Sequence, residues 1–228
     1  MIDIHAHILP LVDDGSASLE QSLQMLKGCA EQGVTDVILT PHCRAHYNES
    51  ADSLRKSFGE FAKVVSENGI NVNLYLGQEV FINKHVKQKL QDGEHLTLNG
   101  SKYLLLEPDY VECEITEAVY ELTHIGYIPI VAHVERFPYI TEQDVVEIKE
   151  LGGLIQVNAS ALFCNDFRTD KKRAKKFLKA GLVDFVASDI HSNRENYMQK
   201  AYKYVKSKYG IKYADAVFIL NAKKIIEG

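Results

Sequence analysis

The residues of this chain that are best suited to chemistry are histidines and carboxylates that follow short apolar segments. His5 and His7 come directly after the first such segment, and Asp13-Asp14-Gly15 follows closely. Side chains of the same types end later segments, namely His42, Glu79, Glu107, His133, Asp189 and His191. A lone His-x-His pair is a weak signal, but a series placed in this way predicts a multi-metal centre at the C-terminal mouth of a strand–helix barrel.

The ligand types narrow the choice of metal and of reaction. Alternate residues of a strand face the same side, so His5 and His7 can bind one cation together. Imidazole and carboxylate without thiolate suit manganese, iron or zinc. Glu79 and Glu107 can bridge two cations, and two cations about 3.5–4 Å apart can hold the entering and leaving oxygens of an in-line phosphoryl displacement.

Each of these residues also has an ordinary structural interpretation when it is taken singly. His133 alone is typical of a hydrogen-bonded core histidine, and Glu107 alone of a carboxylate at a helix start. Asp13 or Asp14 before Gly15 fits a turn, and we expect one of the pair to serve only that role. The complete series, repeated strand after strand, favours the metal site.

The elements that must position these residues alternate along the chain. Short segments rich in Val, Ile and Leu predict seven strands covered on both faces, at residues 1–4, 36–40, 71–76, 103–106, 128–132, 154–157 and 184–187. Two helices with capping sequences start at Ser18 and Thr141. Further helical patterns cover residues 53–67, 116–124, 171–180, 196–209 and 213–226. This alternation predicts an α/β fold, a distorted seven-stranded (β/α) TIM-like barrel with parallel strands.

Composition limits the remaining possibilities. The 228 residues lack an internal repeat or a linker, so we expect one domain over residues 1–228. The net charge of −5 argues against nucleic acid as a partner. No signal peptide is recognisable and no apolar run is long enough for membrane insertion. Four widely spaced cysteines without a C-x-x-C pair favour a reducing cytoplasm over a disulfide framework.

Several charged and aromatic residues lie near the candidate ligands. Arg136 follows His133 and Arg194 follows His191 by three positions each, and we interpret both as bidentate clamps on phosphate oxygens rather than surface ion pairs. The basic segment 168–179 is interpreted as a solvated helix face, with an acidic or phosphorylated partner as the alternative. Three aromatic residues are candidates either for an aromatic-accepting pocket or for packing: Tyr47, Phe137 and Tyr139.

The order of these motifs carries a family resemblance. The sequences H-x-H, D-D-G, T-P-H, G-x-E, L-x-E, A-H-x-E-R and S-D-x-H resemble the PHP (polymerase and histidinol phosphatase) superfamily. More narrowly, the first seven residues, Val12-Asp13-Asp14-Gly15 and Ala132-His133-Val134-Glu135-Arg136 look like those of manganese-dependent tyrosine-protein phosphatases of bacterial capsule and exopolysaccharide loci. The resemblance spans nearly the whole chain and implies a seven-stranded PHP barrel with a three-metal site.

The resemblance also implies a role for each ligand-type residue. The first metal would be bound by His5, His7, Glu79 and Asp189. The second would share Glu79 and be held by Glu107 and His133. The third would be held by Asp14, His42 and His191, which favours Asp14 over Asp13. Arg136 and Arg194 match the family's phosphate-contacting arginines.

The cysteines provide an independent test of mechanism. A cysteine phosphatase needs a nucleophilic Cys six residues before an Arg, so that one loop attacks and binds the phosphate. The residue six positions after each cysteine is Thr35, Glu49, Val119 or Asp170. No cysteine mechanism fits, so phosphatase activity would depend on the metal site.

These observations together predict a metal-dependent phosphotyrosine-protein phosphatase with two or three Mn²⁺ ions, or Fe or Zn, acting on a phosphotyrosine protein such as a bacterial tyrosine kinase tail. One alternative is a PHP-type small-molecule phosphatase, such as a histidinol phosphatase. Another is an amidohydrolase-like barrel hydrolase, which would usually have a bridging Lys or a further His where this chain has Glu107 and Asn158. A protein that uses metals only structurally is disfavoured, because closed structural sites need far fewer ligands.

Overall fold

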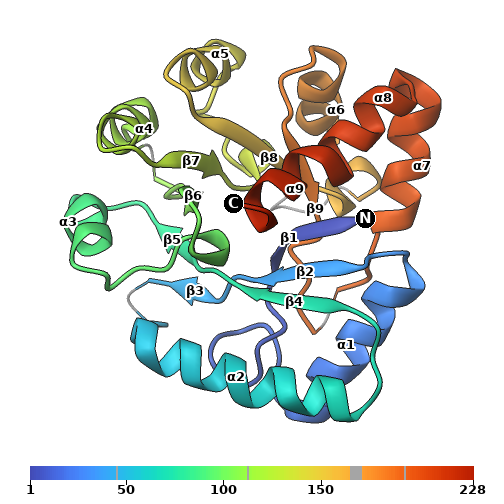
Figure 1. Ribbon diagram of the computed structural model, residues 1–228. Coiled ribbons are helices and arrows are strands. Elements are labelled where there is room, and N and C mark those ends of the chain that lie inside the picture. Colours follow the sequence, from blue (N-terminus) through green and yellow to red (C-terminus); the bar gives the residue numbers. More distant parts are fainter. Residues whose placement is uncertain (45, 112, 165–170, 193) are drawn as a thin grey trace.

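The computed structural model describes residues 1–44, 46–111, 113–164, 171–192 and 194–228. Within these ranges the strands form a curled parallel sheet with helices around it (Figure 1). The strands are β1 (Ile2–Ala6), β2 (Asp36–Leu39), β3 (His42–Cys43), β4 (Asn73–Leu76), β5 (Glu79–Phe81), β6 (Tyr103–Glu107), β7 (Ile128–Val131), β8 (Leu154–Asn158) and β9 (Phe185–Ala187).

The strands pair in two sets that backbone hydrogen bonds connect. One sheet has the order β1-β2-β4 and the other β3-β5-β6-β7-β8-β9, and all these pairs are parallel. On one side the Gly77 N–H donates to the Leu39 carbonyl at 2.8 Å and the Glu79 N–H donates to the Pro41 carbonyl at 3.1 Å, which continues the β2–β4 pairing into the β3–β5 pairing. On the other side the His7 N–H donates to the carbonyl of Ile190, just after β9, at 3.0 Å. The C-terminal ends of the strands therefore gather at one mouth.

Each of the seven expected strand ranges contains a strand, and the second and third are each followed by an additional short strand, β3 and β5. Pro41 separates β2 from β3 because proline has no N–H for a ladder hydrogen bond. Gly77 separates β4 from β5 where the chain passes Leu98 so closely that a Cβ would lie 2.6 Å from the Leu98 side chain. The described residues thus contain nine strands in place of the expected seven.

The helices lie at the expected positions, with one addition. They are α1 (Leu19–Glu31), α2 (Ala51–Glu67), α3 (Val86–Gln91), α4 (Ile115–His124), α5 (Glu142–Glu150), α6 (Lys171–Lys179), α7 (Met198–Tyr209), α8 (Ile211–Asp215) and α9 (Asn221–Ile226). Only α3, a six-residue helix, was not expected. Ser18 caps α1 by accepting from the Gln21 N–H, and Thr141 with Asp144 forms a complete capping box on α5.

The basic segment 168–179 is described only from residue 171, and its first three residues lie outside the described part of the chain. Residues 171–179 form α6, where Lys172, Lys176 and Lys179 are exposed. Arg173 departs from the expectation of a solvated face. Its guanidinium donates to the carbonyls of Phe137 at 2.8 Å and Ile140 at 2.6 Å. This side chain therefore stabilises the loop that follows Arg136.

The expected helix over residues 213–226 is irregular. It consists of α8, a π-helical turn over Ala216–Leu220 and α9. In Figure 1, α9 crosses the middle of the ring of strands. Ala222 and Ile225 of α9 pack with Ile2 and Tyr103, which lie at the starts of their strands. The C-terminal segment therefore fills the barrel at the end opposite the mouth.

The larger apolar cluster lies between the sheet and the surrounding helices. Leu26 of α1, Val119 of α4 and Ile148 of α5 are fully or almost fully buried in it, together with Val37 and Val157 from the sheet. This two-sided burial agrees with the continuous apolar composition of the strands. None of the helices in the described part of the chain combines the length and apolar character that crossing a bilayer requires.

Candidate metal centre

An irregularity in β1 brings His5, and His7 just after the strand, to the interior of the mouth. In a regular strand, Ile4 and Ala6 would share a face. Here Ile4 packs in the interior cluster and Ala6 in the outer one, and the register between β1 and β2 shifts between Asp3 and Ala6. His5 and His7 thus converge as expected, with their Nε2 atoms 3.1 Å apart.

The turn after β1 separates the roles of its two aspartates. Asp13 Oδ2 lies 2.7 Å from His7 Nδ1 and accepts from the His42 N–H at 3.0 Å. Asp13 Oδ1 accepts from the Gly15 N–H at 2.9 Å. The expectation that one aspartate serves only a turn is therefore wrong, because Asp13 also fixes the orientation and tautomer of His7.

One group of ligand-type atoms joins the two ends of the sheet. It consists of His5, His7 and Asp189, all of them buried. Asp189 Oδ1 lies 3.5 Å from the Nε2 atom of either histidine. Glu79 Oε2 approaches the same nitrogens, at 3.4 Å from His5 and 3.3 Å from His7. These are the four residues that the family resemblance assigned to the first metal.

Glu79 connects this group to the next. Its Oε1 lies 2.8 Å from His133 Nε2. Its Oε2 lies 2.7 Å from His42 Nδ1, which is also 3.6 Å from Glu107 Oε2. His133 and Glu107 therefore reach Glu79 from different strands, in two overlapping groups. The position of Glu79 between them agrees with the expected bridging role.

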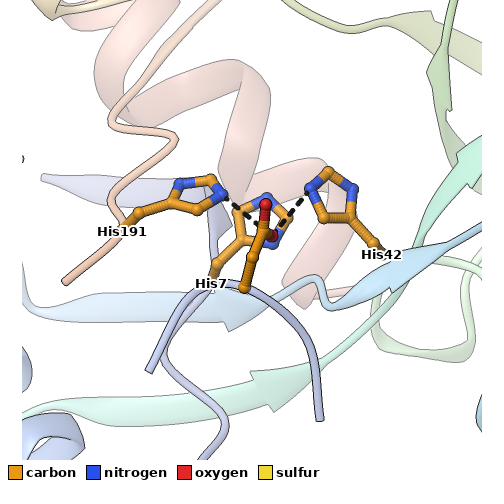
Figure 2. A group of neighbouring side chains, drawn as sticks. His7, His42 and His191 are labelled. Carbon is orange, nitrogen blue, oxygen red and sulfur yellow. Dashed lines mark ion pairs between the residues drawn. The ribbon is translucent and has the colours of Figure 1, made fainter. Parts of the chain in front are cut away.

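A third group lies closest to the turn after β1. Figure 2 shows the imidazoles of His7, His42 and His191 gathered around one carboxylate. This carboxylate belongs to Asp14, whose Oδ1 is 3.3 Å from His42 Nε2 and 3.5 Å from His191 Nε2. Asp14 is 42% exposed, unlike the other eight expected ligands, so this group faces the opening of the mouth.

The nine expected side chains all lie in these four overlapping groups, and their chemistry fits divalent cations. Glu79 Oε2 and Glu107 Oε2 are buried, and neither accepts a hydrogen bond from any residue that the structure describes. Uncompensated buried carboxylate oxygens are costly unless a cation is nearby. The mixture of imidazole and carboxylate suits manganese, iron or zinc.

The electrostatics of the cluster leave His133 and Asp189 in the forms that bind a cation, whereas Glu107 and His42 would each release a proton on binding one. Burial raises the pKa of Glu107 to about 7, and the charge of Glu79 adds to the effect. Burial, assisted by Arg136, lowers the pKa of His133 to about 4, which leaves its imidazole neutral. Burial opposes ionisation of Asp189, but Arg136 outweighs it and holds the pKa of that carboxyl well below its usual range. A neutral imidazole and ionised carboxylates are the forms that bind metal.

Two polar residues of β8 support the cluster and were missed by sequence reasoning. Gln156 Oε1 accepts from the His133 backbone N–H at 2.8 Å and lies 3.2 Å from His5 Nδ1. The Asn158 amide donates to Asp189 Oδ2 at 2.8 Å. Both residues are fully buried at alternate positions of an otherwise apolar strand. That spacing was the sequence signal that could have identified them.

In the described residues, three arginines contact carboxylates of the cluster. Two of these arginines were expected near the site from the sequence. Arg136 and Arg194 both pair with Asp189 Oδ2, the oxygen that is not shared with His5 and His7. Arg136 is almost buried, whereas the Arg194 side chain is 29% exposed. The third, Arg44, pairs with Glu107 and Asp14. It stands two positions after His42, one fewer than the spacing of the other two arginines, so a search for any arginine shortly after a ligand-type histidine would have found it.

The three aromatic candidates differ in their surroundings. Phe137 is fully buried, with its ring 5.7 Å from that of His133. The Tyr139 hydroxyl donates to the Asp109 carbonyl at 2.6 Å. Tyr47 is only partly buried and its ring lies nearly parallel to that of His42, at 6.0 Å. Phe137 and Tyr139 therefore serve packing, and Tyr47 lies beside the mouth.

Comparison with known proteins identifies close sequence relatives. The family profile described as "Capsular polysaccharide synthesis, CpsB/CapC" matches residues 1–227. The tyrosine-protein phosphatase CpsB of Streptococcus pneumoniae is 33% identical, covering 99% of this chain and 98% of its own length. The tyrosine-protein phosphatase YwqE of Bacillus subtilis is also 33% identical, with 92% and 85% covered.

Solved structures give the same result for the fold. A structure from a study of YwqE from Bacillus subtilis and CpsB from Streptococcus pneumoniae, described as unique metal-dependent tyrosine phosphatases, superposes with a TM-score of 0.86. It is 30% identical, and the match covers 94% of this chain and 90% of that one. A β-aspartyl dipeptidase from Fervidobacterium islandicum has a TM-score of 0.64 at 15% identity, covering 99% and 72%, which shows a shared TIM-like fold alone.

The first testable consequence concerns Gly15. A Cβ at this position would lie 2.1 Å from the His7 carbonyl oxygen, so Gly15→Ala must displace the turn that carries Asp13 and Asp14. We expect a loss of stability of about 1–3 kcal/mol, together with reduced metal content. Gly28→Ala is the matched control, because a Cβ there meets nothing within 4 Å inside α1 and should stabilise by roughly 0.5–1 kcal/mol. Denaturant unfolding and metal analysis of both variants test this, and equal behaviour would contradict it.

A second consequence separates the metal cluster from the thiols. Cys29 and Cys43 are buried and none of the four cysteines belongs to a metal group in the described residues. We expect gently purified protein to hold two or three transition-metal ions per chain. Chelation should abolish phosphatase activity and added manganese should restore it, whereas thiol alkylation should leave activity largely intact. Complete inactivation by alkylation with all metal retained would contradict this expectation.

Proposed function

The chain belongs to the capsular polysaccharide synthesis family CpsB/CapC, and we propose that it is a metal-dependent tyrosine-protein phosphatase, a phosphoric monoester hydrolase. Relatives that match nearly the whole chain are named tyrosine-protein phosphatases. The observation that carries the proposal is the cluster of ligand-type side chains at the mouth, bordered by arginines. We propose as metal ligands His5, His7, Asp14, His42, Glu79, Glu107, His133, Asp189 and His191.

The protein's own residues account for substrate binding and orientation. Divalent cations held by these ligands would supply Lewis-acid stabilisation of charge on the phosphoryl oxygens. Arg194 is partly exposed beside Asp189 and can donate to a phosphoryl oxygen entering from solvent. Arg136 lies deeper and is held by Asp189, which keeps its guanidinium oriented before substrate arrives. Asn158 retains Asp189 Oδ2 when an arginine turns to the substrate.

Tyrosine is a suitable leaving group for such a site. Its phenol has a pKa of about 10, so the phenolate departs more readily than an alkoxide and makes a modest demand on a general acid. Tyr47, beside His42 and partly exposed, offers an aromatic surface next to the mouth. The cysteines lack the spacing to arginine that a cysteine phosphatase requires.

Several finer aspects belong to the same proposal. We infer that the metal is manganese, two or three ions per chain, with iron or zinc as alternatives. We also infer a seven-stranded barrel of the PHP superfamily, in which β2 with β3 and β4 with β5 each form one interrupted strand. Hydrogen bonds to neighbouring strands continue across the interruptions: the Thr40 N–H donates to the Ala6 carbonyl, and the Glu79 N–H donates to the Pro41 carbonyl. Residues 1–228 would be this one domain.

The biological setting is inferred from the family description. Capsular polysaccharide synthesis is consistent with a phosphotyrosine protein as the substrate, and we propose a bacterial tyrosine kinase tail. A role in capsule or exopolysaccharide synthesis follows from the same description. The cytoplasmic location stays a prediction from the four unpaired cysteines, and the absence of nucleic-acid binding stays a prediction from the net charge of −5.

A direct comparison of substrates tests the proposed function. We expect manganese-loaded protein to hydrolyse phosphotyrosine peptides with a higher kcat/KM than phosphoserine peptides or histidinol phosphate. A higher kcat/KM for histidinol phosphate would favour the small-molecule phosphatase instead. Hydrolysis of cyclic amides or dipeptides without phosphatase activity would favour an amidohydrolase-like enzyme.

The two expected arginines provide a mutational test. Arg136→Ala and Arg194→Ala should each lower kcat/KM for an aryl phosphate, by on the order of 10²–10³ where the lost contact is to transition-state charge. The effect of Arg194→Ala should be the smaller, because its side chain is more exposed. Metal content should persist, since both guanidiniums contact Oδ2 of Asp189 and leave Oδ1 to the histidines.

Lysine variants sharpen this test. Lys at either position should restore only part of the rate, because an ammonium cannot reproduce the bidentate geometry of a guanidinium. If the arginines were only ion-pair partners, the alanine variants would change stability but leave kcat and KM near those of the wild type. Steady-state kinetics with parallel metal analysis distinguish the two cases.

A further inference from the structure

Arg44 is held at the mouth by a closed turn of the backbone. It follows β3 directly, and its N–H donates to the Tyr47 carbonyl at 2.9 Å. The Tyr47 N–H donates back to the Arg44 carbonyl at 2.8 Å. The Cα of Arg44 is therefore fixed two residues beyond His42, and only its side chain is left to move.

The guanidinium of Arg44 connects two different metal groups. Its Nη1 lies 3.3 Å from Glu107 Oε1, and its Nη2 lies 3.6 Å from Asp14 Oδ2. Glu107 belongs to the group around Glu79, whereas Asp14 belongs to the group with His191. The Arg44 side chain is 29% exposed, the same fraction as that of Arg194. It thus reaches both the carboxylates and the solvent at the opening.

Arg44 also completes the distribution of positive charge around the cluster. Arg136 and Arg194 both contact Asp189, at the end of β9. Arg44 contacts the cluster through different carboxylates, those of Glu107 and Asp14. A phosphoryl group that binds in the mouth presents three non-bridging oxygens. Arg136 and Arg194 both pair with Asp189, so they would approach these oxygens from the same side. A third guanidinium, coming from β3, supplies donors from another direction.

Cation binding changes the balance of forces on Arg44. Its two weak pairs, at 3.3 and 3.6 Å, exist because Glu107 and Asp14 carry negative charge. If Glu107 and Asp14 held divalent cations, their negative charge would be neutralised and the guanidinium of Arg44 would lose its attraction to them. The side chain is then free to donate to an anion at the opening, and a planar guanidinium binds phosphate oxygens in bidentate fashion.

We propose that Arg44 is a third phosphate-binding arginine, which leaves Glu107 and Asp14 to metal ions and donates to the phosphoryl oxygens of the substrate. This inference rests on the proposed phosphatase function. Tyr47 acts as a positioning residue, because its ring lies beneath the guanidinium, 5.7 Å from it, and beside His42.

Equilibrium binding of inorganic phosphate to the manganese-loaded protein tests the proposal without relying on turnover. Isothermal titration calorimetry is run on the wild type and on Arg44→Ala, Arg44→Lys and Arg55→Ala, with metal content measured in each sample. Arg55 is the matched control, because it is an exposed arginine of α2 that pairs only with Asp52 in the salt bridges described. We expect Arg44→Ala to weaken phosphate binding on the order of ten- to a hundredfold. Arg44→Lys should recover part of the loss, and Arg55→Ala should match the wild type.

Metal titration supplies the second readout. Arg44→Ala should bind manganese as tightly as the wild type or more tightly, because a cation that competes for Glu107 and Asp14 has been removed. Unchanged phosphate affinity in Arg44→Ala would overturn the assignment of Arg44 while leaving the proposed function intact. Loss of metal from this variant would also overturn it, because Arg44 would then help to hold the ions. A wild-type protein that turns over no phosphotyrosine peptide and binds no phosphate would overturn both.

Discussion

The burial of several carboxylates in one small volume is the constraint on which the rest of this structure depends. Glu79, Asp189 and Glu107 are at most 2% exposed, and their oxygens approach the same few imidazole nitrogens. Desolvated charges of like sign oppose folding strongly unless opposite charge or donors accompany them. Arg44 and Arg194 at the opening and the more deeply buried Arg136 supply part of that compensation, and cations in the proposed metal groups would supply the remainder. The fold therefore brings together charged side chains that no isolated strand could hold close to one another.

The two ends of the interior surrounded by the strands contain different kinds of side chain. The interior near the strand starts is filled by apolar side chains and by α9, whose Ile225 packs against Ile2. The interior near the strand ends contains the buried ligand-type side chains. Gln156 and Asn158 continue that polar lining along β8 and fix His5, His133 and Asp189 by hydrogen bonds. Hydrogen-bond partners outside the metal shell set the tautomer and orientation of metal-binding histidines. Gln156 and Asn158 therefore contribute to the site as well as to the sheet.

The sequence was most informative where a ligand-type residue follows an apolar segment, because parallel strands bring their C-terminal ends together whatever the details of the barrel. That rule placed His5, Glu79 and Asp189 in one cluster, and the structure brings them together. It said nothing about residues whose role depends on tertiary neighbours. Asp13, Gln156 and Arg44 act through partners that are 6 to 151 positions away in the chain, such as His7, Glu107 and His5, and that only the fold brings near. The additional strands β3 and β5 follow Pro41 and Gly77, which are visible in the sequence, but the close approach of Gly77 to Leu98 depends on the fold.

Backbone strain at two of the proposed ligands shows how closely this arrangement is tied to the site. His133 and Asp189 have positive φ angles, 32° and 49°, at the points where the chain leaves β7 and β9. A side chain other than glycine in this region costs about 1–2 kcal/mol, so each position is held there by its surroundings. At His133 the holding contacts are the backbone hydrogen bond to Gln156 and the ring contact with Glu79. At Asp189 they are the backbone N–H donated to His5 and the carboxylate pairs with Arg136 and Arg194. In both cases the left-handed turn directs the side chain over the end of its own strand and into the cluster. An extended residue at either position would continue along the direction of its strand. The backbone strain at His133 and Asp189 is therefore what it costs to bring ligands from separate strands together.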